Sequence, residues 1–432
     1  MRLKTWAAIG AALALPLLSG CGDENAQKGF VRIVNATTEY ASLDLYTQAS
    51  DGTNDLVVSG TAAGAASAYT NIDKGDYTFN IKSGSGASNA TSTTGTISKT
   101  DHYSVVTYLT GGTAKAQFLS DEETSPASGS TKLRVFNAAT SEASSVDVYL
   151  TGNACNALAV TDTPFATAQT GLQATYSQVT SKSWNVCVFP TGDKSTLLLD
   201  IPALTLKSQE VATLILTHTA GGVLLNGAVL DQQGSMTPYT SQISRVRVAA
   251  DPSSGLTTVT LNGTEITAAA AAQSISPYVT IPSAALTAAI TIDGVTLNVT
   301  TLPAATAGSD YTLLVTGTSS NAAATLITDD NSVSTSTTQT VRARLINGVN
   351  NGSGTVSATI DNRTIGPAAF KVASQYVTIP STTGTSTVQP SITTSPAVLA
   401  SQSFVSKGVY TVFIWGDATT GQTPKLAVNA DR

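Results

Sequence analysis

Catalysis by a serine or cysteine nucleophile requires a base within hydrogen-bond reach. This chain of 432 residues has two histidines, His102 and His218, which lie far apart in the sequence. It has no Gly-x-Ser-x-Gly segment, no His-Glu-x-x-His segment and no glycine loop of the type that holds phosphate. We therefore interpret both histidines as ordinary surface or strand residues. We predict that the protein is not an enzyme and has no metal site and no cofactor.

Cys21 lies at the exit of an apolar leader. Arg2 and Lys4 precede the apolar residues 6–18, a run too short to cross a bilayer but of the length found in secretory signals. Leu18-Ser19-Gly20-Cys21 resembles a bacterial lipobox. That resemblance implies cleavage before Cys21 and lipid attachment to its thiol, and two or more acyl chains would hold stably in a membrane. The alternative is an ordinary secretory signal with a chance cysteine.

The residues after Cys21 bear on the choice of membrane. In Gram-negative lipoproteins, an aspartate directly after the lipidated cysteine favours retention in the inner membrane. Here Gly22 occupies that position and Asp23 follows it. We expect a lipid-anchored protein of the cell envelope, in the outer membrane of a Gram-negative bacterium, whose anchor makes the membrane its first partner. No later apolar run is long enough to span a bilayer.

Cys155 and Cys187 are the other two cysteines, 32 positions apart. An exported chain folds where disulfides persist, so we predict a structural bridge between them. Closing a loop of this length would contribute roughly 3–4 kcal/mol in the chain-entropy model. Two free thiols or a metal pair are the alternatives, but neither cysteine has a histidine near it in the sequence.

Four internal repeats provide the elements that would position these residues. Each copy opens with an alternating apolar and polar segment around an arginine, the period of a strand with one buried face. A second short strand, a tyrosine and an apolar hairpin follow in each copy. The arginines are Arg32, Arg134, Arg247 and Arg344, and the tyrosines are Tyr69, Tyr176, Tyr278 and Tyr376. The β-branched residues and Gly/Asn turns favour antiparallel sheet.

We predict an all-β chain, a tandem array of four Ig-like antiparallel β-sandwich modules after a lipoprotein signal peptide. The segments are the signal peptide at 1–20, a tether at 21–28, and modules at 29–123, 130–235, 243–331 and 340–432. Polar stretches at 124–130, 236–242 and 332–339 have the composition of linkers. Four modules in line would form a rod on the order of 100 Å long. Residues 267–273, rich in alanine, are the one place where a helical turn could form.

Charged residues make up 12% of the chain, against roughly 25% in typical soluble domains. The weakly charged, net acidic surface does not suit a nucleic-acid binder, which needs clustered Lys and Arg. Arg32 with Asp44, and Arg134 with Asp147, could pair across neighbouring strands on the exposed face. Such exposed pairs contribute about 0–1 kcal/mol.

Acidic residues gather at the ends of the modules. They are Asp121, Glu122, Glu123, Asp231, Asp329, Asp330 and Asp431. Carboxylates at module junctions can hold calcium and stiffen a repeat protein. We favour solvated linker charge, because only two of the junctions carry more than one acid.

Trp184 and Trp415 are the tryptophans beyond the leader. Exposed aromatic rings on a β-sandwich can stack on sugars. Both residues lie in or at the end of strongly apolar strands, so we favour core or edge packing for them. Sugar stacking remains the alternative.

The segments "VRIVNATTEYASLDLY" and "LRVFNAATSEASSVDVY" resemble the opening of a bacterial family named domain of unknown function four-three-nine-seven. The third and fourth copies match it weakly, because Thr260 and Ser357 replace the aspartate. The resemblance implies an envelope or secreted location and a repeated sandwich fold, and no chemistry. We expect a non-catalytic spacer, scaffold or adhesion module whose partner is an envelope protein or polysaccharide. Glycan or envelope-polymer binding is the alternative, and a hydrolase with an unrecognised site is a remote one.

Overall fold

The computed structural model describes residues 27–84, 89–139, 145–169, 171, 175–219, 222–252, 255–297, 302–334, 338–350, 354–392, 400–417 and 425–432. Within these ranges the chain is built of β-strands with one short 3-10 helix. The fold-class prediction is confirmed: the strands form eight sheets, two in each of four sandwich modules. Cys21, the signal peptide and most of the tether lie outside the described residues.

Module 1 extends from β1 to β9. Its strands are β1 (Lys28–Asn35), β2 (Ser42–Gln48), β3 (Asn54–Ala62), β4 (Ala65–Ala66), β5 (Thr70–Asp73), β6 (Gly75–Lys82), β7 (Asn89–Ile97), β8 (His102–Thr110) and β9 (Thr113–Ser120). One sheet has the order β4-β1-β8-β9, with β5 also paired to β1. The facing sheet has the order β3-β2-β6-β7.

Module 2 extends from β10 to β18. Its elements are β10 (Ser130–Asn137), β11 (Ser145–Thr151), η1 (Cys155–Ala157), β12 (Ala166–Gln169), β13 (Ser177–Thr180), β14 (Ser183–Pro190), β15 (Leu199–Thr205), β16 (Val211–His218), β17 (Leu225–Asp231) and β18 (Met236–Tyr239). The two sheets are β13-β10-β16-β17-β18 and β12-β11-β14-β15.

Modules 3 and 4 repeat the same plan. The strands of module 3 are β19 (Ile243–Pro252), β20 (Thr257–Leu261), β21 (Thr264–Ala270), β22 (Ser274–Ile275), β23 (Val279–Pro282), β24 (Ala288–Ile292), β25 (Val295–Thr296), β26 (Asp310–Gly317) and β27 (Ala323–Asp329). Those of module 4 are β28 (Thr340–Asn350), β29 (Thr355–Ile360), β30 (Arg363–Ala369), β31 (Val377–Pro380), β32 (Thr385–Pro390), β33 (Ala400–Ser403), β34 (Val409–Asp417) and β35 (Lys425–Ala430). Their sheets are β22-β19-β26-β27 with β23 on β19, β21-β20-β24-β25, β31-β28-β34-β35 and β30-β29-β32-β33.

Each module contains one parallel strand pair, which the repeat pattern did not predict. The opening strand runs parallel to the first arm of the closing hairpin, as β1 does with β8 and β28 does with β34. Parallel neighbours need a long crossover connection. In module 1 that connection passes through the second sheet twice, as β2 and β3 and again as β6 and β7, with β4 and β5 of the first sheet between them. We call the sheet that contains the opening strand the arginine sheet.

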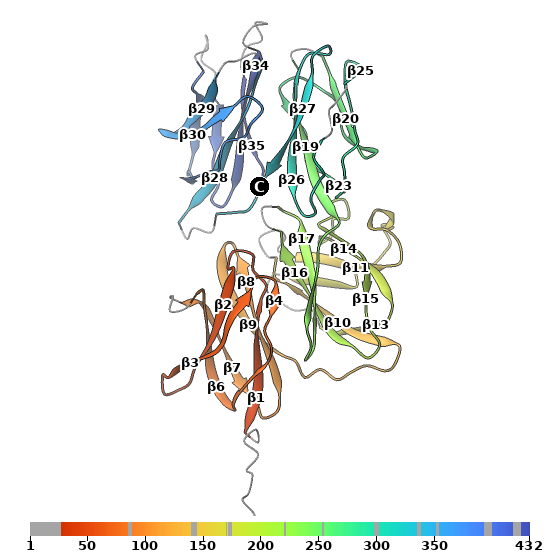
Figure 1. Cartoon of the computed structure of the whole chain (residues 1–432), viewed down its shortest axis with the longest axis vertical. Helices are drawn as coiled ribbons and strands as arrows, with labels where there is room; N and C mark the ends of the chain where they lie inside the picture. The colour runs from red at the N-terminus through yellow and green to blue at the C-terminus, as the bar shows by residue number, and fades with distance from the viewer. Residues whose placement is uncertain are drawn as a thin grey trace, which may run out of the picture.

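The modules are packed in two pairs, and the expectation of four modules in line is wrong. Figure 1 shows modules 1 and 2 side by side in the lower half and modules 3 and 4 side by side in the upper half. An apolar cluster that includes Val34 and Phe136 joins the arginine sheets of the first pair. A second cluster that includes Leu314 and Phe413 joins those of the second pair. Both clusters lie outside the cores that fill each sandwich.

The pairs meet end to end between modules 2 and 3. A Cβ added to Gly222 in module 2 would lie 2.5 Å from the carbonyl oxygen of Gly308 in module 3. Contact this close requires glycine at both positions, and Gly308 also has a φ of +73°. The molecule is therefore two modules wide and two modules long.

One local prediction is also wrong, and the possible helical turn does not form at residues 267–270. Residues 236–242 were expected to be a linker, but Met236–Tyr239 form β18, which pairs with β17. Pro238 is tolerated there because β18 is an edge strand. The alanine-rich residues 267–270 belong to β21, which forms a hairpin with β20, so strand pairing overrides the helix preference of alanine.

Candidate functional site

The arginine of every opening strand lies opposite a hydroxyl residue. The parallel register aligns Arg32 with Ser104, Arg134 with Thr213, Arg247 with Thr312 and Arg344 with Thr411. In each pair the arginine Nε donates to the hydroxyl oxygen, over 2.7–3.1 Å. The strand register therefore builds the same contact four times.

A tyrosine ring covers each of these guanidinium groups. The distances from the guanidinium carbon to the ring centroid are 4.5 Å for Arg32 on Tyr69, 4.5 Å for Arg134 on Tyr176, 4.7 Å for Arg247 on Tyr278 and 4.9 Å for Arg344 on Tyr376. Each tyrosine directly precedes the edge strand that pairs with the opening strand, β5, β13, β23 or β31. Cation–π contacts of this kind gain strength when they are desolvated.

Burial raises the pKa of all four tyrosines above the usual value. For Tyr69 and Tyr278 the negative charge of a nearby aspartate is the next cause. Their hydroxyls are therefore neutral donors across the physiological range. Tyr69 donates to Asp121 at 2.6 Å, and Tyr278 donates to Asp329 at 2.7 Å.

Modules 3 and 4 exchange arginines across their interface. Arg247 of module 3 donates through Nη1 to Oδ1 of Asp431 in module 4, at 2.5 Å. Arg344 of module 4 donates through Nη2 to Oδ1 of Asp329 in module 3. All four side chains are at most 2% exposed. A contact that recurs with the two partners interchanged is the pattern of an isologous, two-fold interface.

Each aspartate of this interface also binds its own module. Oδ2 of Asp329 accepts a hydrogen bond from Thr312 at 2.7 Å, and Oδ2 of Asp431 accepts one from Thr411. Burial by itself would lower the pKa of Arg247 and Arg344, but the facing aspartates raise both pKa values above the usual one. Both arginines therefore keep their charge in the closed interface.

Modules 1 and 2 use the same positions with less symmetry. Asp121 is 2% exposed, and its Oδ2 accepts hydrogen bonds from Ser104 at 2.5 Å and from Tyr69. Arg32 lies 3.6 Å from that oxygen. Arg134 of module 2 brings Nη2 to 4.0 Å from Oδ1 of Asp121, which is beyond hydrogen-bond range.

In the first pair, backbone oxygens take the place of one carboxylate. Arg32 donates through Nη1 to the carbonyl oxygen of Gly234 at 2.5 Å and through Nη2 to that of Asp231 at 3.1 Å. The side chain of Asp231 instead accepts from Lys207 at 3.2 Å. Arg32 thus still ties module 1 to module 2, through the turn after β17.

The predicted exposed pairs Arg32–Asp44 and Arg134–Asp147 are wrong. The arginines lie in β1 and β10, whereas the aspartates lie in β2 and β11 of the facing sheets. Strand alternation does place the arginines away from the module core, but the neighbouring module covers that face and buries them. Each aspartate accepts hydrogen bonds from groups of its own module instead.

The prediction that the acids at the module ends are solvated linker charge is wrong for three of them. Asp121, Asp329 and Asp431 are buried against the arginines. The side chains of Glu122, Glu123 and Asp330 are 34–44% exposed, and each is paired with a basic residue. In the described part of the chain, no group of three or more His, Cys, Asp or Glu side chains is arranged to hold a metal ion.

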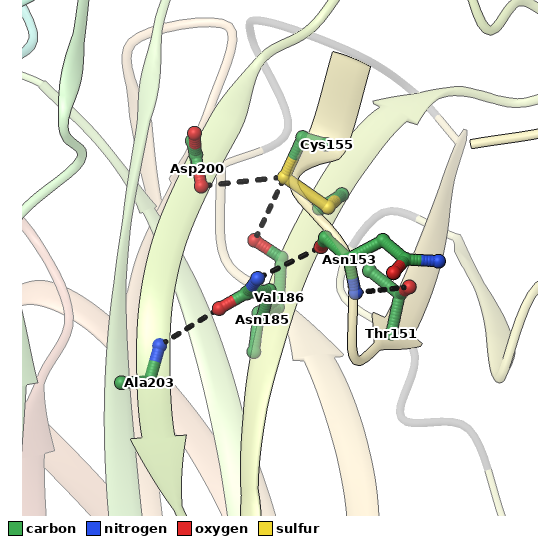
Figure 2. The surroundings of a disulfide bond; sticks show 8 residues. Thr151, Asn153, Cys155, Asn185, Val186, Asp200 and Ala203 are labelled. Carbon is green, nitrogen blue, oxygen red and sulfur yellow. Dashed lines mark hydrogen bonds between the residues drawn. A yellow bond between two sulfur atoms is a disulfide. The ribbon is translucent and has the colours of Figure 1, made fainter. Parts of the chain in front are cut away.

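Cys155 and Cys187 form the predicted disulfide, with their Cα atoms 5.5 Å apart. Figure 2 shows it fastening the loop after β11 to β14. Asn185 supports the same loop, because its Nδ2 donates to the carbonyl oxygen of Asn153 at 2.8 Å while its Oδ1 accepts from the Ala203 amide at 3.0 Å. The bridge therefore fixes a loop on the second sheet of module 2, away from the interface with module 1.

Replacing both cysteines by alanine is expected to lower the free energy of unfolding of module 2 by roughly 3–4 kcal/mol, because the unfolded chain loses a closed loop. Urea unfolding followed by the fluorescence of Trp184, in a Trp415→Phe background, would measure the loss. Wild-type protein in reducing agent should show a loss of similar size. An unchanged midpoint in both samples would contradict the prediction.

The two histidines lie in separate environments, and the Thr38 hydroxyl lies 3.3 Å from the ring nitrogens of His218. His102 begins β8, and its Nδ1 lies 2.8 Å from Glu122. His218 ends β16 and is 5% exposed, with Nε2 3.3 Å from Glu39 of module 1. Burial alone would raise the pKa of Glu39, but hydrogen bonding and attraction to His218 lower it below the usual value.

The two tryptophans also differ. Trp415 is 1% exposed in the interface of modules 3 and 4 and stacks on Phe413. Trp184 packs partly buried against the core of module 2, and Lys182 lies 3.8 Å above its ring. Core or edge packing accounts for both, fully for Trp415 and in part for Trp184.

Two cavities lie at the junction of modules 1 and 2. One, of about 190 Å³, is lined by Thr37, Thr38, Ala63, Gly64, Thr217, His218, Asn226, Gly227, Ala228, Met236, Pro238, Tyr239 and Thr240. The other, of about 620 Å³, is lined by Ser120, Glu122, Glu123, Lys132, Arg134, Thr175 and Tyr176. Clefts between domains are common places for ligands.

Sequence reasoning found the arginines and tyrosines as repeat markers but missed their partnership. The hydroxyl residues Ser104, Thr213, Thr312 and Thr411 were not singled out. A signal was present, because residues at the same place in the four hairpins share a hydroxyl between apolar neighbours. No helix among the residues that the structure describes is long and apolar enough to cross a membrane.

Comparison with solved structures gives distant similarities. The crystal structure of CBMbc (family CBM26) from Eubacterium rectale Amy13K in complex with maltoheptaose is 14% identical, with 44% of this chain and 92% of that chain covered and a TM-score of 0.15. The Bacillus anthracis TIE protein is 11% identical, with 89% of this chain and 68% of that chain covered and a TM-score of 0.16. At these TM-scores neither similarity supports an argument about function.

A comparison with curated proteins finds no match. A family model does match, over residues 29–149. The match extends from β1 through module 1 into β10 and β11 of module 2, so it includes the openings of the first two repeats. Residues 29–149 thus match the family described as domain of unknown function (DUF4397), in agreement with the resemblance seen in the sequence.

Proposed function

We propose that the protein is a non-catalytic, lipid-anchored component of the cell envelope that acts as a spacer, scaffold or adhesion module. The observation that carries the proposal is the reciprocal burial of Arg247 with Asp431 and of Arg344 with Asp329 between modules. Buried ion pairs fix one arrangement, because a displaced member leaves an uncompensated charge. A body held in this way suits the presentation of a surface at a set distance from an anchor.

The placement of the reactive side chains supports a non-enzymatic role. Arg247 and Arg344 are bonded to aspartates across the interface of modules 3 and 4, and the two histidines lie in different environments with a glutamate each. General acid–base catalysis needs a titrating group within reach of a bound substrate and of a second catalytic group. His218, which lines the cavity of about 190 Å³ with Thr38 and lies 3.3 Å from Glu39, comes nearest to that arrangement, whereas the buried arginines and aspartates are committed to one another.

The anchor is testable at Cys21. Changing Cys21→Ser removes the thiol that would carry the lipid, so the protein is expected to move from the membrane fraction to the soluble fraction of lysed cells. Gly22→Asp is the matched variant, because it keeps the thiol and should move the protein from the outer to the inner membrane. A Cys21→Ser protein that stays with membranes would count against the anchor.

Glycan or envelope-polymer binding is a second candidate, and the cavity of about 190 Å³ favours it. Its wall combines the apolar surfaces of Pro238 and Tyr239 with the polar groups of Asn226 and Thr217. This mixture fits a sugar ring, which has an apolar face and hydroxyls at its rim. Binding on a glycan array that is lost in Tyr239→Ala and kept in Trp184→Ala would support it. Loss with Trp184→Ala alone would refute this location.

A further inference from the structure

Arg134 is a buried guanidinium without a partner for its end groups. Its side chain is 7% exposed, and its Nε donates to Thr213 at 2.8 Å. Nη2 is buried and has no hydrogen-bond partner, and no described residue accepts a hydrogen bond from Nη1. Buried donors in folded proteins almost always find an acceptor, so an unmet one needs an explanation.

The other three repeats show what the missing acceptor is. Arg247 and Arg344 each donate to an aspartate carboxylate of the facing module. Arg32 donates to two backbone carbonyl oxygens. The acceptor expected for Arg134 is Asp121, but its Oδ1 is 4.0 Å from Nη2. Asp121 thus stands where the second pair has its carboxylate, but it is too far from Nη2 to accept a hydrogen bond.

A cavity of about 620 Å³ adjoins the unpartnered arginine. Tyr176 lines it as well, and its ring centroid lies 4.5 Å from the guanidinium carbon, which holds the guanidinium plane in place. Lys132 lies in the same wall, with its charge paired to Glu123. Nε is bonded to Thr213 and Nη2 is buried, so Nη1 is the donor of this fixed guanidinium that remains for a ligand, and carboxylates are favoured acceptors for it.

The acidic residues of the wall select among anions. Glu122 accepts from His102 at 2.8 Å, and Glu123 is paired with Lys132, so both are engaged with their own partners. Lys132 lowers the pKa of Glu123 through a hydrogen bond, which keeps this carboxylate charged. Two negative charges in the wall disfavour a doubly charged phosphate or sulfate more than a singly charged carboxylate.

We propose that this cavity, at the junction of modules 1 and 2, binds a carboxylate through the guanidinium of Arg134. The ligand is a small free carboxylate or the carboxylate at the end of a peptide. Bound there, it gives Nη1 of Arg134 a carboxylate acceptor, as Asp431 and Asp329 do for the corresponding arginines of modules 3 and 4. The proposal goes beyond the spacer function, because it assigns a ligand class to one junction.

Titration of arginine-labelled full-length protein with sodium acetate tests the site. The NMR signal of the Arg134 Nε–H group is expected to shift as acetate is added. The shift should saturate at acetate concentrations in the millimolar range, up to about 100 mM. The signal of Arg344, whose partner is in place, is the internal control and should not move. Sodium chloride at equal ionic strength should leave the Arg134 signal unchanged.

N-acetylalanine and its amide separate the two sources of carboxylate. N-acetylalanine mimics the carboxylate at the end of a peptide, and its amide lacks that carboxylate. A shift with N-acetylalanine but not with the amide therefore assigns the site to peptide C-termini as well as to small acids. A shift with acetate alone restricts the site to small free carboxylates. Arg134→Gln should abolish acetate binding, and Tyr176→Leu should weaken it at least about tenfold if the variant keeps its fold. An Arg134 signal that moves with none of these carboxylates, or equally with chloride, overturns the proposal.

Discussion

Asp329→Ala is expected to lower the free energy of unfolding of modules 3 and 4 by about 3–5 kcal/mol. The carboxylate is fully buried and accepts hydrogen bonds from Arg344 of the facing module and from Thr312 and Tyr278 of its own. Its removal leaves Nη2 of a buried guanidinium and the hydrogens of two hydroxyl groups without their acceptor. Urea unfolding followed by the fluorescence of Trp415, with Trp184 replaced by Phe, would measure the change in module 4.

Asp330→Ala is the matched control, because it removes the neighbouring carboxylate. Asp330 is paired with Arg342 at 2.6 Å, but its side chain is 44% exposed. A solvent-exposed pair contributes about 0–1 kcal/mol, so this variant should unfold within about 1 kcal/mol of the wild type. Equal losses for the two variants would show that the buried exchange does not hold the modules together.

Trp415→Ala is expected to cost about 3–5 kcal/mol, because it empties the centre of the apolar contact between modules 3 and 4. The ring is 1% exposed and stacks on Phe413, with 5.2 Å between the centroids. Calorimetric unfolding of the full chain would measure the loss. The transition that contains modules 3 and 4 should move to lower temperature, and the transition of modules 1 and 2 should stay in place.

Trp415→Phe is the conservative partner of that variant. The indole Nε1 of Trp415 is buried and has no hydrogen-bond partner. Phenylalanine has no such donor, so the substitution relieves a penalty of about 1–3 kcal/mol for an unpaired buried group. This gain offsets part of the packing energy that is lost with the smaller ring. We expect a net change within about 1 kcal/mol. A loss as large as that of alanine would mean that the donor is satisfied and that the indole is needed for more than its bulk.

The repeat and the strand periodicity were enough to predict the sandwich fold. Alternation around Arg32 and its three equivalents identified a strand with one face on the module core, which is where Val31 and Ile33 lie. Two cysteines in an exported chain were enough to predict the bridge between Cys155 and Cys187. These inferences succeed because each depends on local chemistry or on a period within one module.

The pairing of modules was not predicted, because the polar face of the opening strand was taken to be exposed. The residue two positions after each arginine is apolar: Val34, Phe136, Ala249 and Ile346. The hairpin strands β8, β16, β26 and β34 each contain consecutive apolar residues, which point to both faces of the strand. Such runs are typical of strands that are buried on both faces. Weighing those positions would have indicated a second covered surface.

The ion-pair partners could not be predicted for a different reason. Asp121 is 89 positions after Arg32 in the sequence and 13 positions before Arg134, and Asp431 is 184 positions from Arg247. Strand periodicity says which face a side chain takes, and not which module covers that face. The nearer acids Asp44 and Asp147 were therefore the obvious but wrong partners. Only the packed arrangement selects the distant ones.

The exchange between Arg247 and Arg344 makes modules 3 and 4 the halves of a dimer fused into one polypeptide. Because one chain carries both halves, their encounter is intramolecular, with an effective concentration on the order of millimolar. Dilution therefore cannot part them, as it would part separate subunits of a scarce protein. Fusion also lets one half change without the other. In the first pair, carbonyl oxygens of Asp231 and Gly234 stand where the second pair has a carboxylate, a divergence that a true homodimer would have to make twice.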